Sequence, residues 1–309
     1  LVELYLGDAR TASLQKLDCD SFSFPLLLGN DSSSYAKWLP DGSGVYFTWL
    51  ARANKAAKLC LVDAATGHVR TLVEERHDKF LNMGTGGTLD GFGNYRFSNF
   101  VTADKAFAFW QSERDGIARL YRYDARTGAC LGPVTPEGLI VQRLIRVEEA
   151  EGVIYFMANC LPGCSDPYYH ALCRVHFDGS GFAVLTPEDG EHSVSMLGDC
   201  FADTWSRVDT PPVTLLRDLA GNLLTQVAQA DISALLEAGY IMPERFHLKA
   251  TDGKTDLYGI LIRPANFDPQ KSYPFIDYIY GGMQIYNVPK VFTWKTGNGR
   301  EIFGGLEEL

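Results

Sequence analysis

The apolar positions of the chain fall into short alternating runs separated by turn residues, which is the pattern of β-hairpins. In one recurring pattern an apolar strand leads into a turn built from Asp, Thr, Gly or Ser and then into a return strand. Its copies begin at Leu4, Leu59, Leu120 and Leu172, with a weaker copy from Val213. Such recurrence predicts an internal structural repeat.

A second two-stranded unit lies between these copies, at residues 35–50, 96–113, 141–159 and 194–208. Two hairpins per repeat give four strands in each stretch of roughly 45 to 60 residues, the length of a β-propeller blade. We therefore expect about four blades between Ser34 and Gln229. A β-sandwich is the alternative, but it would not repeat the same hairpin order four times. The copies lack the Gly-His and Trp-Asp signatures of WD-type propellers, which indicates a propeller of another lineage.

The pattern changes at Ala230. Residues 232–239 are expected to form a short linker helix that begins after Asp231 and ends at Gly239. Two alternating strands joined at Asp252-Gly253 follow, and then an apolar run from Phe275 to Tyr280 that suits a strand buried on both faces. We therefore assign residues 1–230 to the blades and residues 231–309 to the linker and the beginning of a domain of α/β type.

Composition excludes several classes of partner. The 309 residues carry 28 Lys+Arg against 38 Asp+Glu, a net charge of -10, so the basic surface that nucleic acid requires is not expected. No apolar run approaches the roughly 18 to 20 residues of a membrane helix. The first residue is not Met, and we expect that it is not the natural start. The cysteines are odd in number and scattered, which favours reduced thiols and a soluble protein of the cytoplasm or periplasm over a disulfide-rich extracellular one.

The sequence contains few candidate catalytic groups. No serine lies in a G-x-S-x-G context, and no histidine is spaced with a serine or cysteine as in a local triad. The soft ligands Cys160, Cys164, His170, Cys173 and His176 have the right composition for zinc. However, Cys173 and His176 are three residues apart on one predicted strand and so face opposite sides of the sheet. Ordinary cysteines are the favoured interpretation, with zinc or a Cys160–Cys164 disulfide as alternatives, and no metal or organic cofactor is expected.

A glycine-rich stretch at residues 84–94 does not join a strand to a helix, so it is not a phosphate loop. We interpret it as a loop between blades, and Tyr95 and Arg96 at its end as candidates for contact with a ligand.

Several short motifs together resemble the dipeptidyl-peptidase IV branch of the prolyl oligopeptidase serine peptidases. They are Ser112-Glu113-Arg114-Asp115-Gly116 followed by Leu120-Tyr121 in one repeat, and, beyond the linker, Asp252-Gly253, Pro264-Ala265-Asn266-Phe267, Tyr273-Pro274 and Tyr280-Gly281-Gly282. The resemblance implies an eight-bladed propeller, of which about four blades are present here, followed by the first strands of an α/β-hydrolase domain. It also implies a peptide substrate, release of N-terminal dipeptides, and a homodimer of the full-length protein.

By this resemblance Tyr280 takes the place of the tyrosine whose hydroxyl stabilises the oxyanion, although Met283 stands where the family usually has proline. The family's serine, aspartate and histidine follow this tyrosine at a distance, and no matching stretch occurs here. The resemblance therefore predicts a central fragment that is inactive alone. The family's paired glutamates are not matched either, because no Asp-Trp-x-x-x-Glu-Glu stretch occurs here. The adjacent acid pairs Glu74-Glu75 and Glu148-Glu149 lie in ordinary hairpins and are expected at solvated edges. A non-catalytic propeller that binds a protein or peptide is the alternative.

Overall fold

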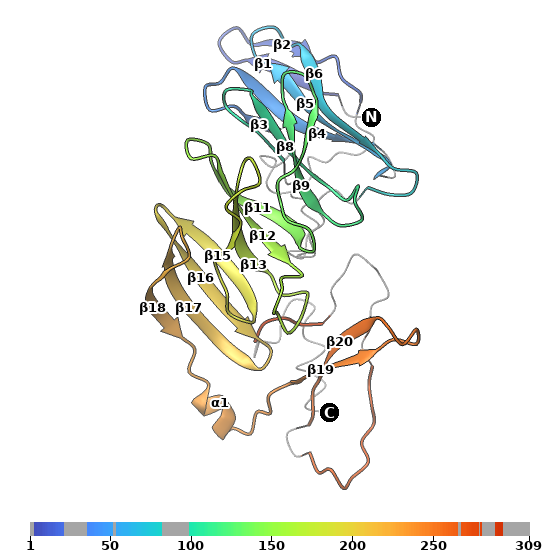
Figure 1. Ribbon diagram of the computed structural model, residues 1–309, viewed down its shortest axis with the longest axis vertical. Helices are drawn as coiled ribbons and strands as arrows, with labels where there is room; N and C mark the ends of the chain where they lie inside the picture. Colours follow the sequence, from blue (N-terminus) through green and yellow to red (C-terminus); the bar gives the residue numbers. More distant parts are fainter. Residues whose placement is uncertain are drawn as a thin grey trace. The chain divides into compact units, whose positions relative to one another are not determined.

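The computed structural model describes residues 3–21, 36–51, 54–81, 99–264, 267–277, 279 and 288–292, which form the sheets drawn in Figure 1. Four sheets each contain four antiparallel strands, paired in the order in which they follow along the chain. They are β3 (Ala36–Trp38), β4 (Gly44–Leu50), β5 (Ala56–Asp63) and β6 (Val69–Arg76); β7 (Asn99–Val101), β8 (Phe107–Ser112), β9 (Arg119–Asp124) and β10 (Cys130–Pro133); β11 (Ile140–Glu148), β12 (Val153–Asn159), β13 (Ala171–His176) and β14 (Ala183–Val184); and β15 (Glu191–Leu197), β16 (Cys200–Arg207), β17 (Thr210–Asp218) and β18 (Leu223–Gln229). The predicted fold, mainly β with about four propeller blades, is confirmed. We number these sheets as blades one to four. The hairpin of β1 (Tyr5–Asp8) and β2 (Ser13–Lys16) forms the copy that begins at Leu4.

An aspartate at the start of each repeated turn explains why these hairpins close in the same way. Asp63 Oδ1 accepts the backbone N–H of Thr66 at 2.9 Å, and Asp124 Oδ1 accepts that of Thr127, also at 2.9 Å. The same kind of contact is made by Asp8, Asp178 and Asp218. Side-chain bonds of this kind satisfy backbone donors that a tight turn leaves without a partner. The repeat seen in the sequence is therefore a repeat of turn chemistry as well as of apolar positions.

The chain forms two compact units, one of residues 1–158 and 173–183 and the other of residues 159–172 and 184–309. In the first unit, one apolar cluster joins residues of blades one and two, among them Leu59 on β5, Trp110 on β8 and Tyr121 on β9. Every residue of β12 is buried. The rings of Phe109 and Phe177 pack with their centroids 4.8 Å apart. Alternating strands thus bury their faces against neighbouring hairpins, as the propeller interpretation requires.

In the second unit, β18 is followed by the predicted linker helix, α1 (Ser233–Glu237), and by the hairpin of β19 (Glu244–Lys249) and β20 (Asp256–Leu261). Asp231 Oδ1 accepts the backbone N–H of Ser233 at 2.9 Å, and Gly239 follows the helix with φ +91°. The β19–β20 turn contains Gly253 at φ +67°, so helix and hairpin both form where the sequence predicts them.

The predicted buried strand over 275–280 is wrong for its described part. Residues 271–277 are not in a strand, and Phe275, Ile276 and Ile279 are 78%, 64% and 77% exposed. A strand buried on both faces needs paired neighbours and a covering layer. Among the described residues, the strands adjacent in sequence, β19 and β20, pair with each other alone.

Candidate functional site

Tyr280, Tyr95 and Arg96 are the residues that the sequence proposes for the active site or for contact with a ligand. All three lie outside the described residues, as do Met283 and the glycine-rich stretch 84–94. Their proposed roles therefore stay predictions.

The cysteine and histidine candidates for zinc are all described, and they are not gathered into a site. Cys173 is buried and His176 is exposed at the end of β13, as the strand alternation predicts. The one group of three or more metal-ligating side chains found among the described residues does not include them. All seven cysteines, which the structure describes in full, are free thiols. Burial raises the pKa of Cys60 to about 11, so this thiol stays protonated at neutral pH.

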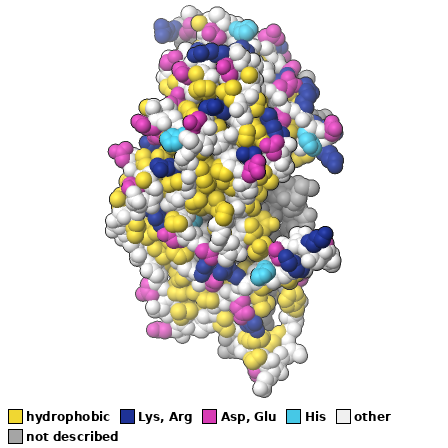
Figure 2. Space-filling model, viewed as in Figure 1, with side chains coloured by type: hydrophobic (Ala, Val, Ile, Leu, Met, Phe, Trp, Pro, Cys, Tyr) yellow, Lys and Arg dark blue, Asp and Glu magenta, His cyan; other side chains and the backbone are white. Residues whose placement is uncertain are grey.

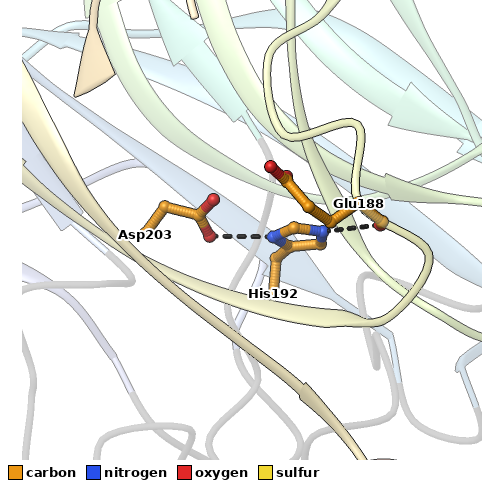
Figure 3. A group of neighbouring side chains, drawn as sticks. All are labelled: Glu188, His192 and Asp203. Atoms are coloured by element: carbon orange, nitrogen blue, oxygen red, sulfur yellow. Dashed lines mark hydrogen bonds and ion pairs between the residues drawn. The ribbon is translucent and has the colours of Figure 1, made fainter. Parts of the chain in front are cut away.

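A charged cluster in blade four is the most elaborate polar arrangement in the second unit (Figure 3). Its members are Glu188, in the turn before β15, His192 on β15, Asp203 on β16 and Arg217 on β17. His192 pairs with Trp205 across the sheet, which makes Asp203 its diagonal neighbour on the same face. Arg217 pairs with Phe201 and is likewise diagonal to Asp203. The register of three strands thus brings His192, Asp203 and Arg217 together, and the turn before β15 adds Glu188.

The hydrogen bonds of this cluster indicate the charge state of His192. His192 Nδ1 lies 2.8 Å from Asp203 Oδ1, and His192 Nε2 lies 3.0 Å from the carbonyl oxygen of Glu188. A backbone carbonyl and an ionised carboxylate both accept hydrogen bonds and cannot donate, so these contacts favour a proton on each ring nitrogen and a cationic imidazole. Burial alone lowers the pKa of His192, but the bond and charge of Asp203, together with Glu188, outweigh it and raise the pKa overall.

Arg217 supplies the second cation. Its Nε donates to Asp203 Oδ2 at 3.2 Å, and its guanidinium also binds Glu188 Oε1 and the carbonyl oxygen of Gly221. Two cations thus face two carboxylates, and Asp203 is completely buried between His192 and Arg217. The ligand atoms of Glu188, His192 and Asp203 lie within 4.8 Å of one another, as in a metal site. However, both ring nitrogens are engaged and Arg217 binds both acids, so we interpret the cluster as an ionic network, in which Glu188 Oε2 is buried without a hydrogen-bond partner.

A second polar network, in the first unit, surrounds Glu75. Trp110 Nε1 and Ser112 Oγ each donate to a different carboxylate oxygen of Glu75, both at 2.7 Å. Arg114 Nε donates to Ser112 Oγ at 3.0 Å, and its guanidinium lies 4.5 Å from the ring centroid of Tyr121. The Ser-Glu-Arg-Asp-Gly motif thus has a structural role, because it places the Arg114 guanidinium over the ring of Tyr121 on β9.

The prediction that both glutamate pairs lie at solvated edges is wrong for Glu75 and Glu149. The Glu75 side chain is only 11% exposed, and Glu149 Oε2 accepts the backbone N–H of Ala103 at 2.7 Å. Both carboxylates bind donors from a neighbouring hairpin, which local hairpin context does not reveal.

The charged surface and the helices bear on two classes of partner. Acidic and basic side chains are interspersed over the face shown in Figure 2 and do not form a basic stripe. Within the described residues, no helix has the length and apolar character needed to span a membrane.

Comparison with known proteins identifies the family. A family model for the dipeptidyl peptidase IV (DPP IV) N-terminal region matches residues 29–212, which is more than half of the chain. The chain belongs to this family. Its blades are therefore propeller blades of the DPP IV type, and the resemblance drawn from the short motifs is confirmed.

Individual relatives agree with this assignment. The chain is 31% identical to dipeptidyl peptidase 8 from Homo sapiens over 159 residues, which are 48% of this chain and 17% of that protein. Dipeptidyl peptidase 8 from Mus musculus matches over the same shares at the same identity. The crystal structure of Porphyromonas gingivalis dipeptidyl peptidase 4 superposes with a TM-score of 0.65 at 19% identity, covering 88% of this chain and 36% of that one. The chain thus spans well under half the length of these relatives.

Sequence reasoning missed both polar networks. Glu188, His192, Asp203 and Arg217 have no local spacing that marks them as a group, and a prediction of strand register would have been needed to bring them together. Glu75 and Ser112 are 37 residues apart and meet across two hairpins.

Proposed function

We propose that this chain is the later propeller blades, the linker and the opening of the catalytic domain of a serine-type dipeptidyl peptidase. The observation that carries the proposal is the DPP IV family match over residues 29–212, which falls on the repeated four-stranded blades. The names of the relatives support peptidase activity. We also propose that the blades occupy residues 1–230 and that the catalytic part begins within 231–309.

In this proposal the intact enzyme hydrolyses peptide bonds by acyl transfer through a serine, with histidine as general base and aspartate orienting it. These three residues would come from sequence outside the present 309 residues. Tyr280 would donate its hydroxyl to the oxyanion of the tetrahedral intermediate. The proposed substrate is a peptide with a free N-terminus.

Labelling by a fluorophosphonate probe tests the assignment of the nucleophile. We expect the full-length protein to be labelled at one serine and to release dipeptides, while the 309-residue chain alone is neither labelled nor active. Stoichiometric labelling of the isolated chain would place a nucleophile within it and contradict this proposal. Full-length protein that is neither labelled nor active would favour a peptide-binding propeller.

Substituting Tyr280→Phe in the full-length protein tests the oxyanion role. Removing one preorganised donor to an oxyanion lowers kcat by about 10²-fold or more. Because phenylalanine keeps the ring, circular dichroism should be unchanged. An unaltered kcat would remove Tyr280 from the active site.

A further inference from the structure

One short loop of the second unit contacts three described segments that follow the linker helix. The loop joins β12 to β13, and its residues Ser165, Asp166, Tyr168 and Tyr169 all take part. Together with Ser206 on β16 and Asp209 in the β16–β17 turn, we call these residues the dock. Its partners lie in β19, β20 and residues 288–292.

The first contact holds β19. Arg245 Nε donates to Asp209 Oδ2 at 3.0 Å, and Arg245 Nη1 donates to Ser165 Oγ at 2.6 Å and to the Tyr169 hydroxyl at 3.4 Å. Arg245 thereby joins one strand of the hairpin to both parts of the dock. The second contact holds β20, because the ring of Tyr258 packs edge-on against Tyr168, with centroids 6.1 Å apart.

The third contact holds residues 288–292. Lys290 Nζ donates to Asp166 Oδ2 at 2.7 Å and lies 4.9 Å from the ring centroid of Tyr168. The Lys290 and Asp166 side chains are only 13% and 10% exposed, so this ion pair is largely removed from solvent. Nearby, the backbone N–H of Phe292 donates to Ser206 Oγ at 3.2 Å, and the Phe292 ring packs edge-on against Tyr240.

Further hydrogen bonds, which do not involve the three partner segments, hold the loop in shape. Asp166 Oδ1 accepts the backbone N–H of Tyr168 at 2.9 Å, which leaves Oδ2 for Lys290. The backbone N–H of Ser165 donates to Asp189 Oδ1 at 2.8 Å, and that of Cys160 donates to the carbonyl oxygen of Pro167 at 2.8 Å. A preorganised loop orders few additional groups when its partners bind.

We propose that the dock fixes the opening of the catalytic domain on the propeller, and that Asp166 and Lys290 are positioning residues for the reaction. In sequence, the proposed oxyanion donor Tyr280 lies between the anchors at Arg245 and Tyr258 and the anchor at Lys290. A catalytic donor has to be held within about 0.5 Å of its productive position, so its flanking anchors must be rigid. The positioning of Tyr280 for catalysis rests on the proposed function. The attachment of the three segments at the dock does not depend on it.

Amide hydrogen exchange on the 309-residue chain tests the docking. A two-stranded hairpin is marginally stable by itself, so β19 and β20 depend on their attachment. We expect Asp166→Asn and Lys290→Met each to speed exchange in Glu244–Lys249, Asp256–Leu261 and residues 288–292 by about tenfold or more. Asp256→Asn is the matched control, because its 2.7 Å ion pair with Lys249 lies within the hairpin and is 39% and 54% exposed. Equal exchange in the two dock variants and the wild type would overturn the docking.

Peptidase kinetics on the full-length protein test the positioning role. Asp166→Asn should lower kcat about tenfold and change KM by less than about twofold, since a positioning defect acts on the transition state. In a Tyr280→Phe background the same change should have little further effect, because both act through one donor. Full additivity, or an unchanged kcat despite faster exchange, would refute positioning. Wild-type protein without peptidase activity would refute the proposed function and the positioning role together, and the exchange data would still decide the docking.

Discussion

Asp203→Asn is the substitution that tests the ionic network of blade four most directly. Asp203 is completely buried and accepts from two cations, from His192 Nδ1 at 2.8 Å and from Arg217 Nε at 3.2 Å. Asparagine has nearly the same shape, so it leaves no cavity. It removes the negative charge, however, and its NH₂ group must face one of two donors. The substitution therefore isolates the electrostatic contribution from the packing contribution.

The expected magnitude follows from burial. Removing one partner of a buried ion pair costs about 3 to 5 kcal/mol, because the remaining charge stays buried without compensation. Asparagine still offers one acceptor oxygen, and His192 can lose its proton, so we expect the lower end, about 3 kcal/mol. Since each 1.4 kcal/mol is a factor of ten, amide exchange in β15–β17 should become about 10²-fold faster.

Hydrogen exchange followed by mass spectrometry measures this blade separately from the rest of the chain. Glu74→Gln is the matched control. The Glu74–Arg76 pair is shorter, at 2.6 Å, but its side chains are 38% and 71% exposed, so its loss should cost less than about 1 kcal/mol in β6. If exchange in β15–β17 accelerates less than threefold in Asp203→Asn, the buried network contributes little and our reasoning fails.

Two other predictions concern the network of blade four and the network around Glu75. The pKa of His192 is raised in the folded blade, so its contribution to stability is complete below about pH 6.5, the ordinary histidine value, and is lost as the pH rises through the folded pKa. Opening of β15–β17, corrected for intrinsic exchange, should therefore become easier above about pH 6.5, and a profile independent of pH would contradict the cationic assignment. In the first unit, Glu75→Gln should destabilise β8 by about 1 to 3 kcal/mol, because an amide cannot accept from both Trp110 Nε1 and Ser112 Oγ. Exchange in β8 that matches the wild type would refute this.

The blades could be predicted from sequence because their signals are local. Apolar alternation sets each strand, and aspartates such as Asp63 and Asp124 set each turn within three residues. The linker helix and the β19–β20 hairpin were predictable for the same reason. The run from Phe275 to Tyr280 also has a local signal, but a doubly buried strand depends on neighbours that the run itself does not specify.

The polar contacts could not be predicted, because they depend on register and on long-range folding. Asp166 and Lys290 are 124 residues apart, and Ser165 and Arg245 are 80 apart. No spacing rule connects such positions. The error on Glu75 has the same origin: acidic residues in a hairpin are usually exposed, and contacts with the neighbouring hairpin leave this side chain only 11% exposed.

The buried residues of blade four are largely polar or charged, whereas those of β12 in blade three are mostly apolar. In β12, which belongs to the third blade, all seven residues are buried. In β15–β18 the buried residues are Phe201 and Leu215 together with His192, Asp203, Ser206 and Arg217, and every residue of β18 is exposed. Apolar contacts tolerate small shifts between strands, whereas paired charges with fixed hydrogen-bond geometry do not. We therefore infer that the network helps to fix the register of β15, β16 and β17. The same register sets the positions of Asp209, in the β16–β17 turn, and of Ser206 on β16. Both residues bind segments held at the dock.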